Sequence, residues 1–401
     1  MSSAGADVSQ GTGLAVAAGG RIFSYLLRYG SGAVAPDACD FLAGNPTGLP
    51  IPGYIEALQA AVVPDSPAYF RYGPPWQPAV DAAAAALGAR LKLDLDPEDV
   101  FLTRGAASGL VVLLRVLLDP GDEVVMMSPP WFFYESLVLQ EGGVPVVVPL
   151  TDDRFDLDLE AIERALTPKT RVVLINTPHN PSGRIYPADD LAGLGEILEA
   201  ASARSGRRVY LMSDEAYARI LFDGNEMVTP AHHYPATFML HTYSKTILAP
   251  MQRAGYLALA PGMPAAGTLR QAVLWASLTS SAPPDTGMQH AIPRLKELII
   301  DLAPLRARRD RLVTALRDNG YRLGVPQAGF YLFVRTPIPD AVAFCDWLAE
   351  RKVFTLPGEA FDRPGYFRLS LTATDDMVDR VLPVLAEAQR HFAPNGAASR
   401  S

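Results

Sequence analysis

Seven short apolar runs, each the length of one β-strand, are the feature that most constrains how this chain can fold. They lie near residues 99–103, 123–127, 144–149, 171–175, 208–212, 238–242 and 254–259. Between them lie stretches with the spacing of amphipathic helices, for example 79–91 and 191–201. Strands that alternate with helices in this way indicate a largely parallel sheet covered by helices. The sequence therefore predicts an α/β domain.

Polar residues directly follow three of these runs. They form the segments 176–183 (Asn-Thr-Pro-His-Asn-Pro-Ser-Gly), 213–217 (Ser-Asp-Glu-Ala-Tyr) and 241–246 (His-Thr-Tyr-Ser-Lys-Thr). Open α/β sheets bind ligands beyond the carboxyl ends of their strands, so we expect the three segments to share one site.

The third segment carries Lys245, eight residues before Arg253. This spacing indicates an amine beside a phosphate site. A lysine with its ordinary pKa of about 10.4 is a poor nucleophile, but desolvation or nearby cations can remove its proton. The free amine can then react with an aldehyde, and pyridoxal 5′-phosphate carries one.

With these motifs the chain resembles the class I and II aminotransferases, which are pyridoxal-phosphate enzymes of fold type I. The resemblance extends from about residue 41 to about residue 385. It implies a large domain with a mixed, mostly parallel seven-stranded sheet and a smaller α+β C-terminal domain. We expect an N-terminal arm at 1–45 that is part of the small domain, the large domain at 46–285, the small domain at 286–393 and a disordered tail at 394–401. A long charged amphipathic helix is expected through 294–316, with shorter strands near 330–335 and 366–371.

The resemblance implies catalytic and cofactor-binding roles for four residues. Lys245 would bind the cofactor aldehyde covalently, Asp214 would pair with the pyridine nitrogen, and Tyr217 and Asn180 would hydrogen-bond the 3′-oxygen. A carboxylate at the ring nitrogen keeps that nitrogen protonated, which makes the ring an electron sink. The alternatives are a helix N-cap for Asp214, a core aromatic for Tyr217 and an ordinary turn for 180–183.

The phosphate group of the cofactor would lie between two segments. Arg253 and Thr242, with Ser244, would hold it from one side. From the other side, a loop of small residues joins the first predicted strand to a helix, and Ala106 and Ala107 occupy the phosphate-binding positions. Backbone N–H groups at a helix N-terminus bind anions well, so small side chains suit this loop.

Four further residues complete the site that the resemblance implies. Trp131 would stack on the pyridine ring, and it would contact the substrate together with Asn180. Arg368 would clamp the substrate α-carboxylate with its planar guanidinium, whereas the alternative is a strand residue that faces water. Gly44 would lie against the substrate. Tyr72 would reach the phosphate of a neighbouring subunit, which requires a homodimer.

Composition narrows the remaining classes of function. The chain has 43 acidic and 35 basic residues, so its net charge of −8 argues against a nucleic-acid surface. The two cysteines form no disulfide framework, and the six histidines show no metal-ligand pattern. No secretory signal and no membrane-spanning run is visible. We expect a cytoplasmic protein that binds neither metal, nucleic acid nor membrane.

The predicted reaction is amino transfer between an amino acid and a 2-oxo acid. The same residues can also support a C–S β-lyase, another elimination or a decarboxylation. The segment 277–284 offers no cation for a second carboxylate, so we expect a neutral, aromatic or unusual donor rather than aspartate. Met251 stands where a glycine is usual two residues before the phosphate-binding arginine, which leaves room for a specialised biosynthetic enzyme.

Two other classes of protein fit the sequence less well. A transcriptional regulator with an aminotransferase-like domain needs a DNA-binding module, and the chain has neither the spare length nor a basic helix-turn-helix. A nucleotide-dependent dehydrogenase needs a G-x-G-x-x-G segment after its first strand, and residues 105–109 (Gly-Ala-Ala-Ser-Gly) do not match it.

Overall fold

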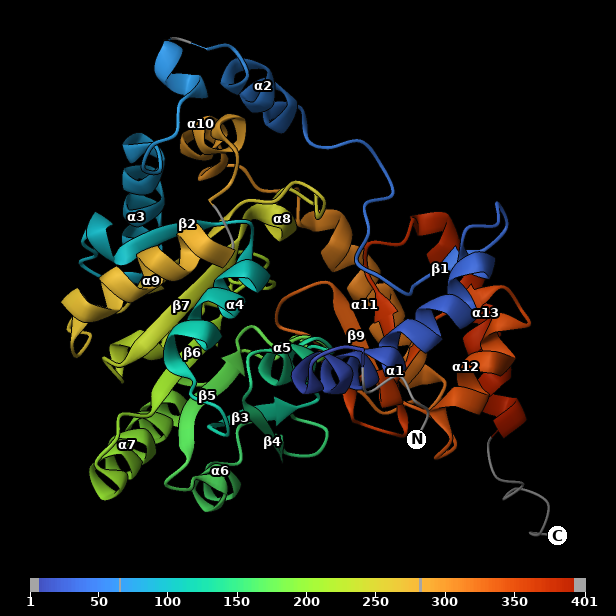
Figure 1. Ribbon diagram of the computed structural model, residues 1–401. Coiled ribbons are helices and arrows are strands. Elements are labelled where there is room, and N and C mark those ends of the chain that lie inside the picture. The colour runs from blue at the N-terminus through green and yellow to red at the C-terminus, as the bar shows by residue number, and fades with distance from the viewer. Residues whose placement is uncertain (1–6, 65, 281–282, 393–401) are drawn as a thin grey trace, which may run out of the picture.

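A seven-stranded sheet forms the centre of the larger lobe in the computed structural model, which describes residues 7–64, 66–280 and 283–392 (Figure 1). In spatial order its strands are β2 (Val100–Thr103), β8 (Gly255–Leu259), β7 (Thr237–Thr242), β6 (Tyr210–Asp214), β5 (Thr170–Asn176), β3 (Glu123–Ser128) and β4 (Val144–Pro149). Only β8 runs antiparallel to its neighbours. All seven predicted strands are confirmed, as is the mixed, mostly parallel sheet. The predicted tail at 394–401 lies outside the described residues.

Helices cover both faces of this sheet (Figure 1). On one face, α2 (Pro52–Ala61), α3 (Gln77–Leu91) and α10 (Thr286–Leu295) pack over β2, β7 and β8 in a core of their own. On the other face, α4 (Ala106–Leu117) and α9 (Ala266–Ser280) pack against the same strands. The remaining helices of this lobe are α5 (Tyr134–Gln140), α6 (Leu159–Ala165), α7 (Ala188–Ser205) and α8 (Tyr243–Thr246). The predicted helices at 79–91 and 191–201 are confirmed.

The smaller lobe is built from C-terminal elements and a short N-terminal strand. Its helices and strands are α11 (Ala303–Asp318), β9 (Tyr331–Arg335), α12 (Ala341–Ala349), β10 (Val353–Phe354), β11 (Leu356–Pro357), β12 (Tyr366–Ser370) and α13 (Asp375–Phe392). β11, β12 and β9 form an antiparallel sheet, and β1 (Cys39–Asp40) pairs in parallel with β10. This is the predicted α+β arrangement.

The N-terminal helix α1 (Gln10–Ala33) links the two lobes. Its Arg21 forms ion pairs with Glu135 of α5, at 2.6 Å, and with Asp362 of the smaller lobe. The predicted arm therefore contacts both lobes.

The long helix predicted through 294–316 is wrong, because the chain leaves the helical path between α10 and α11. Pro304 explains the break. A proline ring clashes with the carbonyl four residues earlier, here that of Ile300, but is well accepted in the first turn of a new helix. The N–H of Ile300 instead donates to the carbonyl of Thr246 at 2.8 Å. Since α10 packs with α2 and α3, we propose that the large domain ends in the segment 296–302 rather than at residue 285.

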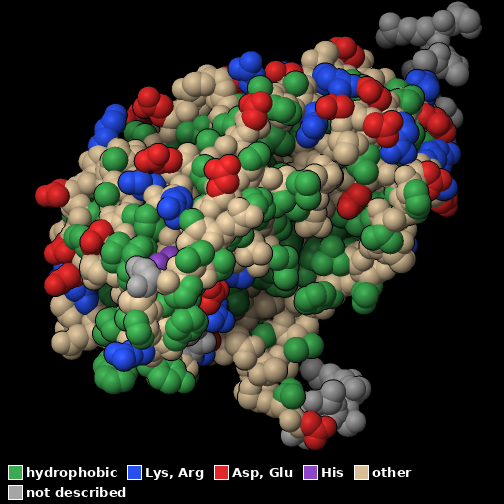
Figure 2. Space-filling view, turned by 90° about the horizontal axis from the view of Figure 1, so that it is seen from above, with side chains coloured by type: hydrophobic (Ala, Val, Ile, Leu, Met, Phe, Trp, Pro, Cys, Tyr) green, Lys and Arg blue, Asp and Glu red, His purple; other side chains and the backbone are tan. Residues whose placement is uncertain are grey.

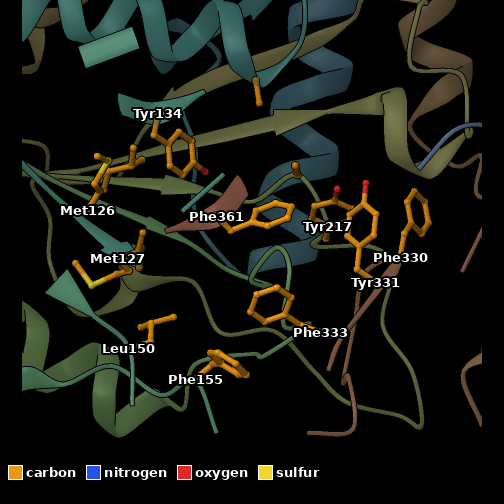
Figure 3. Close-up of a cluster of buried hydrophobic side chains, with 14 of the residues drawn as sticks. Met126, Met127, Tyr134, Leu150, Phe155, Tyr217, Phe330, Tyr331, Phe333 and Phe361 are labelled. Carbon is orange, nitrogen blue, oxygen red and sulfur yellow. The ribbon is translucent and has the colours of Figure 1, made fainter. Parts of the chain in front are cut away.

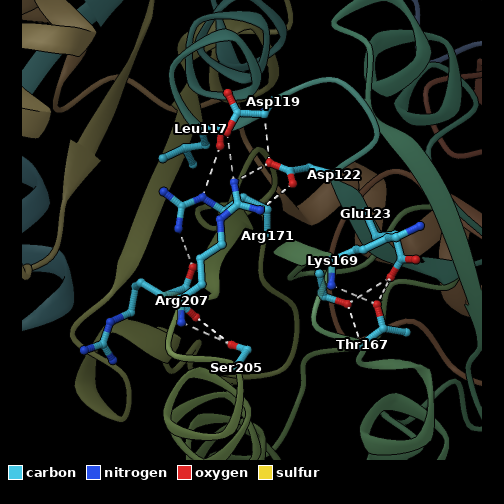
Figure 4. Close-up of polar contacts among 11 residues, drawn as sticks. Leu117, Asp119, Asp122, Glu123, Thr167, Lys169, Arg171, Ser205 and Arg207 are labelled. Carbon is cyan, nitrogen blue, oxygen red and sulfur yellow. Dashed lines mark hydrogen bonds and ion pairs between the residues drawn. The ribbon is translucent and has the colours of Figure 1, made fainter.

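Polar contacts fix the amino-terminal ends of the central strands, at the edge of the sheet away from the polar segments (Figure 4). Arg207, just before β6, donates to Asp122, just before β3, at 2.7 Å. Arg171 of β5 donates to the carbonyls of Leu117 and Arg208 at 3.1 and 2.6 Å. These contacts hold the strands in register and leave the carboxyl ends free for a site.

The described residues contain no helix that is long and apolar enough to cross a membrane. They also contain no group of three or more His, Cys, Asp or Glu side chains arranged to hold a metal ion.

Candidate active site

A cavity lies at the carboxyl ends of β5, β6 and β7, where Asn176 and Asp214 are neighbours across the sheet. It brings together every predicted cofactor contact except Tyr72. Its lining consists of Ala106, Ala107, Trp131, Asn176, Asn180, Asp214, Ala216, Tyr217, Thr242, Ser244, Lys245, Pro250 and Arg253. Ala106 and Arg253, which are 147 positions apart, thus meet because the parallel strands end at one edge.

One corner of the cavity suits a phosphate group. Arg253 donates to Ser244 Oγ at 2.9 Å and to the Pro250 carbonyl at 2.8 Å, but no carboxylate among the described residues pairs with it. Burial lowers the pKa of this guanidinium, so an anion is needed to compensate its charge. Gly105, with φ 85°, leaves room for Arg253, because a side chain there would meet the guanidinium. α4 begins at the next residue, Ala106, and its free N–H groups face the same corner.

The lining of the cavity also includes a buried carboxylate. Asp214 is 6% exposed and accepts hydrogen bonds from Tyr134 Oη at 2.6 Å and from the Ala216 N–H at 3.1 Å. Burial raises its pKa, and no cation pairs with it directly among the described residues. A protonated pyridine nitrogen would supply the missing charge. The N-cap alternative is wrong, because turns rather than a helix follow Asp214.

Lys245 also lines the cavity, on the one-turn helix α8. Thr242 starts this helix by accepting a hydrogen bond from the Ser244 N–H at 3.2 Å. The Lys245 Nζ lies 5.6 Å from the centre of the Tyr217 ring. Trp131 forms part of the wall, and its edge-on contact with Tyr134, at 5.4 Å between ring centres, fixes its orientation. The side chains present therefore fit pyridoxal 5′-phosphate at its phosphate, its ring nitrogen and its aldehyde.

Arg368 of β12 lies beside this cavity and is 2% exposed, so the alternative that it faces water is wrong. It donates to the Leu42 carbonyl at 2.7 Å and to Asn180 Oδ1 at 3.4 Å, while its Nε has no partner. Among the described residues no carboxylate pairs with it. Burial lowers its pKa, although the phenols of Tyr331 and Tyr217 oppose this effect. A carboxylate ligand would satisfy both the charge and the free Nε.

Tyr331 of β9 is a site residue that the sequence analysis missed. Its phenol lies next to that of Tyr217 (Figure 3), and the two groups interact. A Cβ atom on Gly44 would lie only 2.7 Å from the Tyr331 hydroxyl, so this close approach requires glycine. Burial alone would raise the pKa of Tyr331, but the charges of Arg368 and Lys245 outweigh it and hold the pKa below its usual value.

Tyr134 and Asn176 were also missed as individual site residues. Tyr134 supports the carboxylate of Asp214. Asn176 donates to the Asp214 carbonyl at 2.8 Å and accepts from the Asn180 N–H at 2.7 Å, which fixes the turn that carries Asn180. Tyr331 lies inside a predicted strand, Asn176 opens one of the three polar segments, and Tyr134 lies three residues after Trp131.

Tyr72 lies away from the cavity, and its side chain is fully exposed. It follows a short 3-10 helix, Pro67–Phe70, at the surface of the larger lobe. Its contact with a cofactor phosphate stays a prediction, because it requires a second copy of the chain.

Comparison with known proteins agrees with this geometry. The profile of the family "Aminotransferase class I and II" matches residues 36–385. An aspartate aminotransferase of Thermotoga maritima is 32% identical over 310 residues, which are 75% of this chain and 78% of that protein. An aspartate/prephenate aminotransferase of Thermus thermophilus is 32% identical over 306 residues, or 72% and 75% of the two chains. The solved structure of an amino transferase from Eubacterium rectale has a TM-score of 0.87 at 25% identity and covers 92% of this chain and 95% of that one.

The family match spans both lobes and every predicted contact in the cavity. It confirms the resemblance and the fold, and with them the cofactor and the class of enzyme. The chain therefore belongs to the class I and II aminotransferases, fold type I enzymes that depend on pyridoxal 5′-phosphate.

Proposed function

We propose that this aminotransferase takes the amino group of a neutral, aromatic or unusual amino acid. The buried and unpaired guanidinium of Arg368 suits the α-carboxylate that every amino acid has, and the lack of a further cation in the described lining of the cavity carries the choice of donor. Among the described residues that line the cavity, Lys245 and Arg253 are the only cations. Lys245 is required for the reaction itself, and Arg253 lies in the phosphate corner. This leaves no described cation there for a second carboxylate on the substrate.

The segment 277–284 supports the same conclusion only in part. It carries no cation, but residues 281 and 282 lie outside the described residues. Met251 is 86% exposed and does not line the cavity, so it leaves the shape of the cavity unchanged. A role in a specialised biosynthetic pathway stays a prediction.

We assign the proton transfer to Lys245. When bound, pyridoxal phosphate supplies an aldehyde and an electron-withdrawing ring. The Lys245 amine, released when the substrate amine arrives, takes the proton from the substrate α-carbon and holds it for the next step. Asp214 keeps the ring nitrogen protonated, and Tyr134 holds the Asp214 carboxylate in place.

The other predicted residues bind and orient. Tyr217 and Asn180 position the cofactor through its 3′-oxygen, and Trp131 covers one face of its ring. Arg368 and Asn180 fix the substrate carboxylate, with Gly44 leaving room beside it. The phosphate contacts come from Arg253, Thr242, Ser244 and the N–H groups at Ala106 and Ala107.

Steady-state kinetics with a panel of amino acids and 2-oxoglutarate test the donor class. Phenylalanine or leucine should give a kcat/KM at least about tenfold above that of aspartate, since an unpaired distal carboxylate costs roughly one charge-assisted contact or more. A preference for aspartate would overturn the proposal. That donor is the second candidate, because two relatives are named aspartate and aspartate/prephenate aminotransferases.

The same assays separate amino transfer from a C–S β-lyase, another elimination or a decarboxylation. Amino transfer forms a 2-oxo acid and no ammonia. Release of ammonia with pyruvate and a thiol would identify β-elimination, and release of carbon dioxide would identify decarboxylation.

We also propose that the enzyme is a homodimer. Large apolar side chains are exposed in the larger lobe, among them Leu49, Phe70, Tyr72 and Met251. Figure 2 shows hydrophobic side chains gathered on the face seen from above, the side on which α2 lies in Figure 1. Exposed apolar patches of this kind mark interaction surfaces. Sedimentation should give twice the mass of one chain, whereas a monomer that retains full activity would contradict the proposal.

A cytoplasmic location is part of the same proposal. Cys39 and Cys345 are both free and buried, and neither has a disulfide partner. Unpaired cysteines are the rule in reducing compartments, which supports this location. Cell fractionation tests it.

A further inference from the structure

A second cavity lies behind the cofactor cavity, and cations dominate its lining. It has a volume of about 400 Å³, and its lining residues come from α3, the segment just after α10, the start of α8 and the strands β7 and β8, with Arg219 from the loop after β6. Figure 1 labels α3, α8, α10 and β7. His241 and Tyr243 line it, whereas Thr242 and Ser244 line the cofactor cavity. His241 and Thr242 are successive residues of β7 and therefore point to opposite faces of the sheet. Tyr243 and Ser244 open α8, so the end of β7 and the start of α8 serve both cavities. The mechanism uses none of the side chains in the second cavity.

Three cations among the described residues, Arg90, Arg219 and Lys296, line this cavity, together with one carboxylate, Glu297. Arg219 has no ion pair and no hydrogen bond to any described residue, and burial together with the charge of Arg90 lowers its pKa. Lys296 lies 3.9 Å from Glu297, whose side chain is 82% exposed, so this pair is weak. Glu215 is the other carboxylate within reach.

Burial acts to lower the pKa of Arg90, but Tyr256 and Glu215 outweigh it and raise the pKa, so Arg90 is charged although its contact with Glu215 is long. The nearest atoms of Arg90 and Glu215 are 3.5 Å apart, and the Arg90 side chain is 19% exposed while that of Glu215 is 1% exposed. Both terminal nitrogens of Arg90 are buried and lack a hydrogen-bond partner, as does Glu215 Oε2. Buried charges in folded proteins are normally paired and hydrogen-bonded, so Arg90 has donors to spare.

The hydroxyl of Tyr243 supplies an independent observation. Tyr243 is 2% exposed, lines the cavity, and its buried hydroxyl has no hydrogen-bond partner. Burial raises its pKa, so the hydroxyl keeps its proton and remains a donor. Leaving such a donor without an acceptor costs roughly 1–3 kcal/mol, which an anionic ligand would recover.

We propose that this cavity is a second anion site, which binds the oxyanion of a small phosphate or carboxylate compound between Arg90, Arg219 and the hydroxyl of Tyr243. Guanidinium groups match both oxyanions because their donors form a planar fork. Lys296 adds positive charge at the rim. Ala85, Ala86 and Ala89 of α3 form an apolar wall, which leaves room for the body of the ligand. The site is separate from the phosphate corner at Arg253, which opens on the other side of β7.

Calorimetric titration of the cofactor-loaded enzyme with inorganic phosphate, and separately with propionate, tests the proposal. Arg219→Gln should weaken binding by about tenfold or more, the factor expected for one charge-assisted contact. Tyr243→Phe should weaken it by a smaller factor. Arg368→Gln is the control: it should leave phosphate binding unchanged, whereas any propionate binding that it removes belongs to the substrate clamp and not to this cavity. Tighter binding of phosphate than of propionate indicates a phosphoryl ligand, and tighter binding of propionate indicates a carboxylate ligand.

Thermal unfolding provides a second readout that does not depend on activity. Phosphate should raise the unfolding temperature of the wild-type holoenzyme more than that of Arg219→Gln, because a ligand of the folded state stabilises it by mass action. Without ligand, Arg219→Gln should unfold at the same or a higher temperature, since it removes an uncompensated charge near Arg90. Binding of neither anion, or binding that Arg219→Gln and Tyr243→Phe leave unchanged, overturns the proposal.

Discussion

The guanidinium carbon of Arg368 lies 3.9 Å from the centre of the Tyr331 ring. The phenol of Tyr331 in turn interacts with Tyr217 and lies against Gly44. Tyr331 thus connects Arg368, the predicted substrate clamp, with Tyr217, the predicted ligand of the cofactor 3′-oxygen. Arg368 keeps its charge without a carboxylate because an aromatic face, a carbonyl and an amide surround it.

Arg368→Lys should raise the KM for amino acids by about 10- to 100-fold while cofactor affinity stays within a factor of about two. Lysine keeps the charge but loses the planar fork that holds a carboxylate with two hydrogen bonds. Kinetics and a cofactor titration measure the two effects. Arg309→Lys is a control, because Arg309 is equally buried but pairs with Asp223 and Asp310. That change should lower stability and leave KM unchanged; an unchanged KM in Arg368→Lys would remove Arg368 from the site.

Tyr331→Phe should lower kcat by about tenfold, the value of one hydrogen bond to a functional group. It should also remove one titration step from the ultraviolet absorbance of the tyrosines. The pKa of Tyr331 lies below its ordinary value of about 10, so the step that the variant loses occurs below that pH. A group with a lowered folded pKa stabilises the folded state fully above its unfolded pKa, and this contribution is lost as the pH falls through the folded pKa. Any stability that Tyr331→Phe loses through this group should therefore grow as the pH rises toward about 10. An identical titration curve in the variant would contradict the assignment.

Asp214→Asn should have opposite effects on the apoenzyme and the holoenzyme. Burial raises the pKa of Asp214, so the folded apoprotein holds this proton more tightly than the unfolded chain. Such a group costs stability once the pH exceeds its unfolded pKa of about 3.9, and the cost is absent below it. At pH 7 the variant apoenzyme should unfold at a higher temperature than the wild type, and the difference should shrink as the pH falls toward 4.

With cofactor bound, the ring nitrogen of the Asp214→Asn variant lacks its counter-charge. Cofactor affinity should therefore fall by about tenfold or more. Thermal scans of both forms across the pH range decide the matter. A variant apoenzyme less stable than the wild type at pH 7 would show that Asp214 supports the fold rather than the cofactor.

Tyr72→Phe should weaken cofactor binding about threefold to tenfold if Tyr72 reaches the phosphate of a neighbouring subunit. Tyr69→Phe is the matched control, because its hydroxyl already donates to the Ala61 carbonyl of the same chain at 3.0 Å. Cofactor titrations at protein concentrations above and below the dissociation constant of the dimer measure the effect. Equal affinities in the two variants would remove Tyr72 from the cofactor site.

The strands and the cofactor cavity could be predicted because their signals are local in the sequence. Each strand of the large sheet is a short apolar run, and Asn180, Asp214 and Lys245 follow such runs in segments whose order is specific to the family. Parallel pairing then brings the segments together without further information.

The features that were missed depend on contacts between distant segments. Tyr134 is an aromatic residue among several, and only the packing of α5 brings its hydroxyl to Asp214, 80 residues away. The alternating pattern of β9 cannot show that Tyr331 faces Gly44. The break before α11 had a local signal, Pro304, but the charged helical pattern on both sides of it outweighed that signal in the prediction.

The central claim is that Lys245 holds the cofactor, and borohydride reduction of the loaded protein followed by peptide mass mapping tests it most directly. Reduction makes the bond between an amine and the cofactor aldehyde permanent, so the added mass reports which lysine was bound. We predict the added mass on the peptide that contains Lys245, its absence in Lys245→Ala together with the visible absorbance of the bound cofactor, and no change in Lys296→Gln. Labelling of another lysine in the wild type, or unchanged labelling and absorbance in Lys245→Ala, would contradict the account.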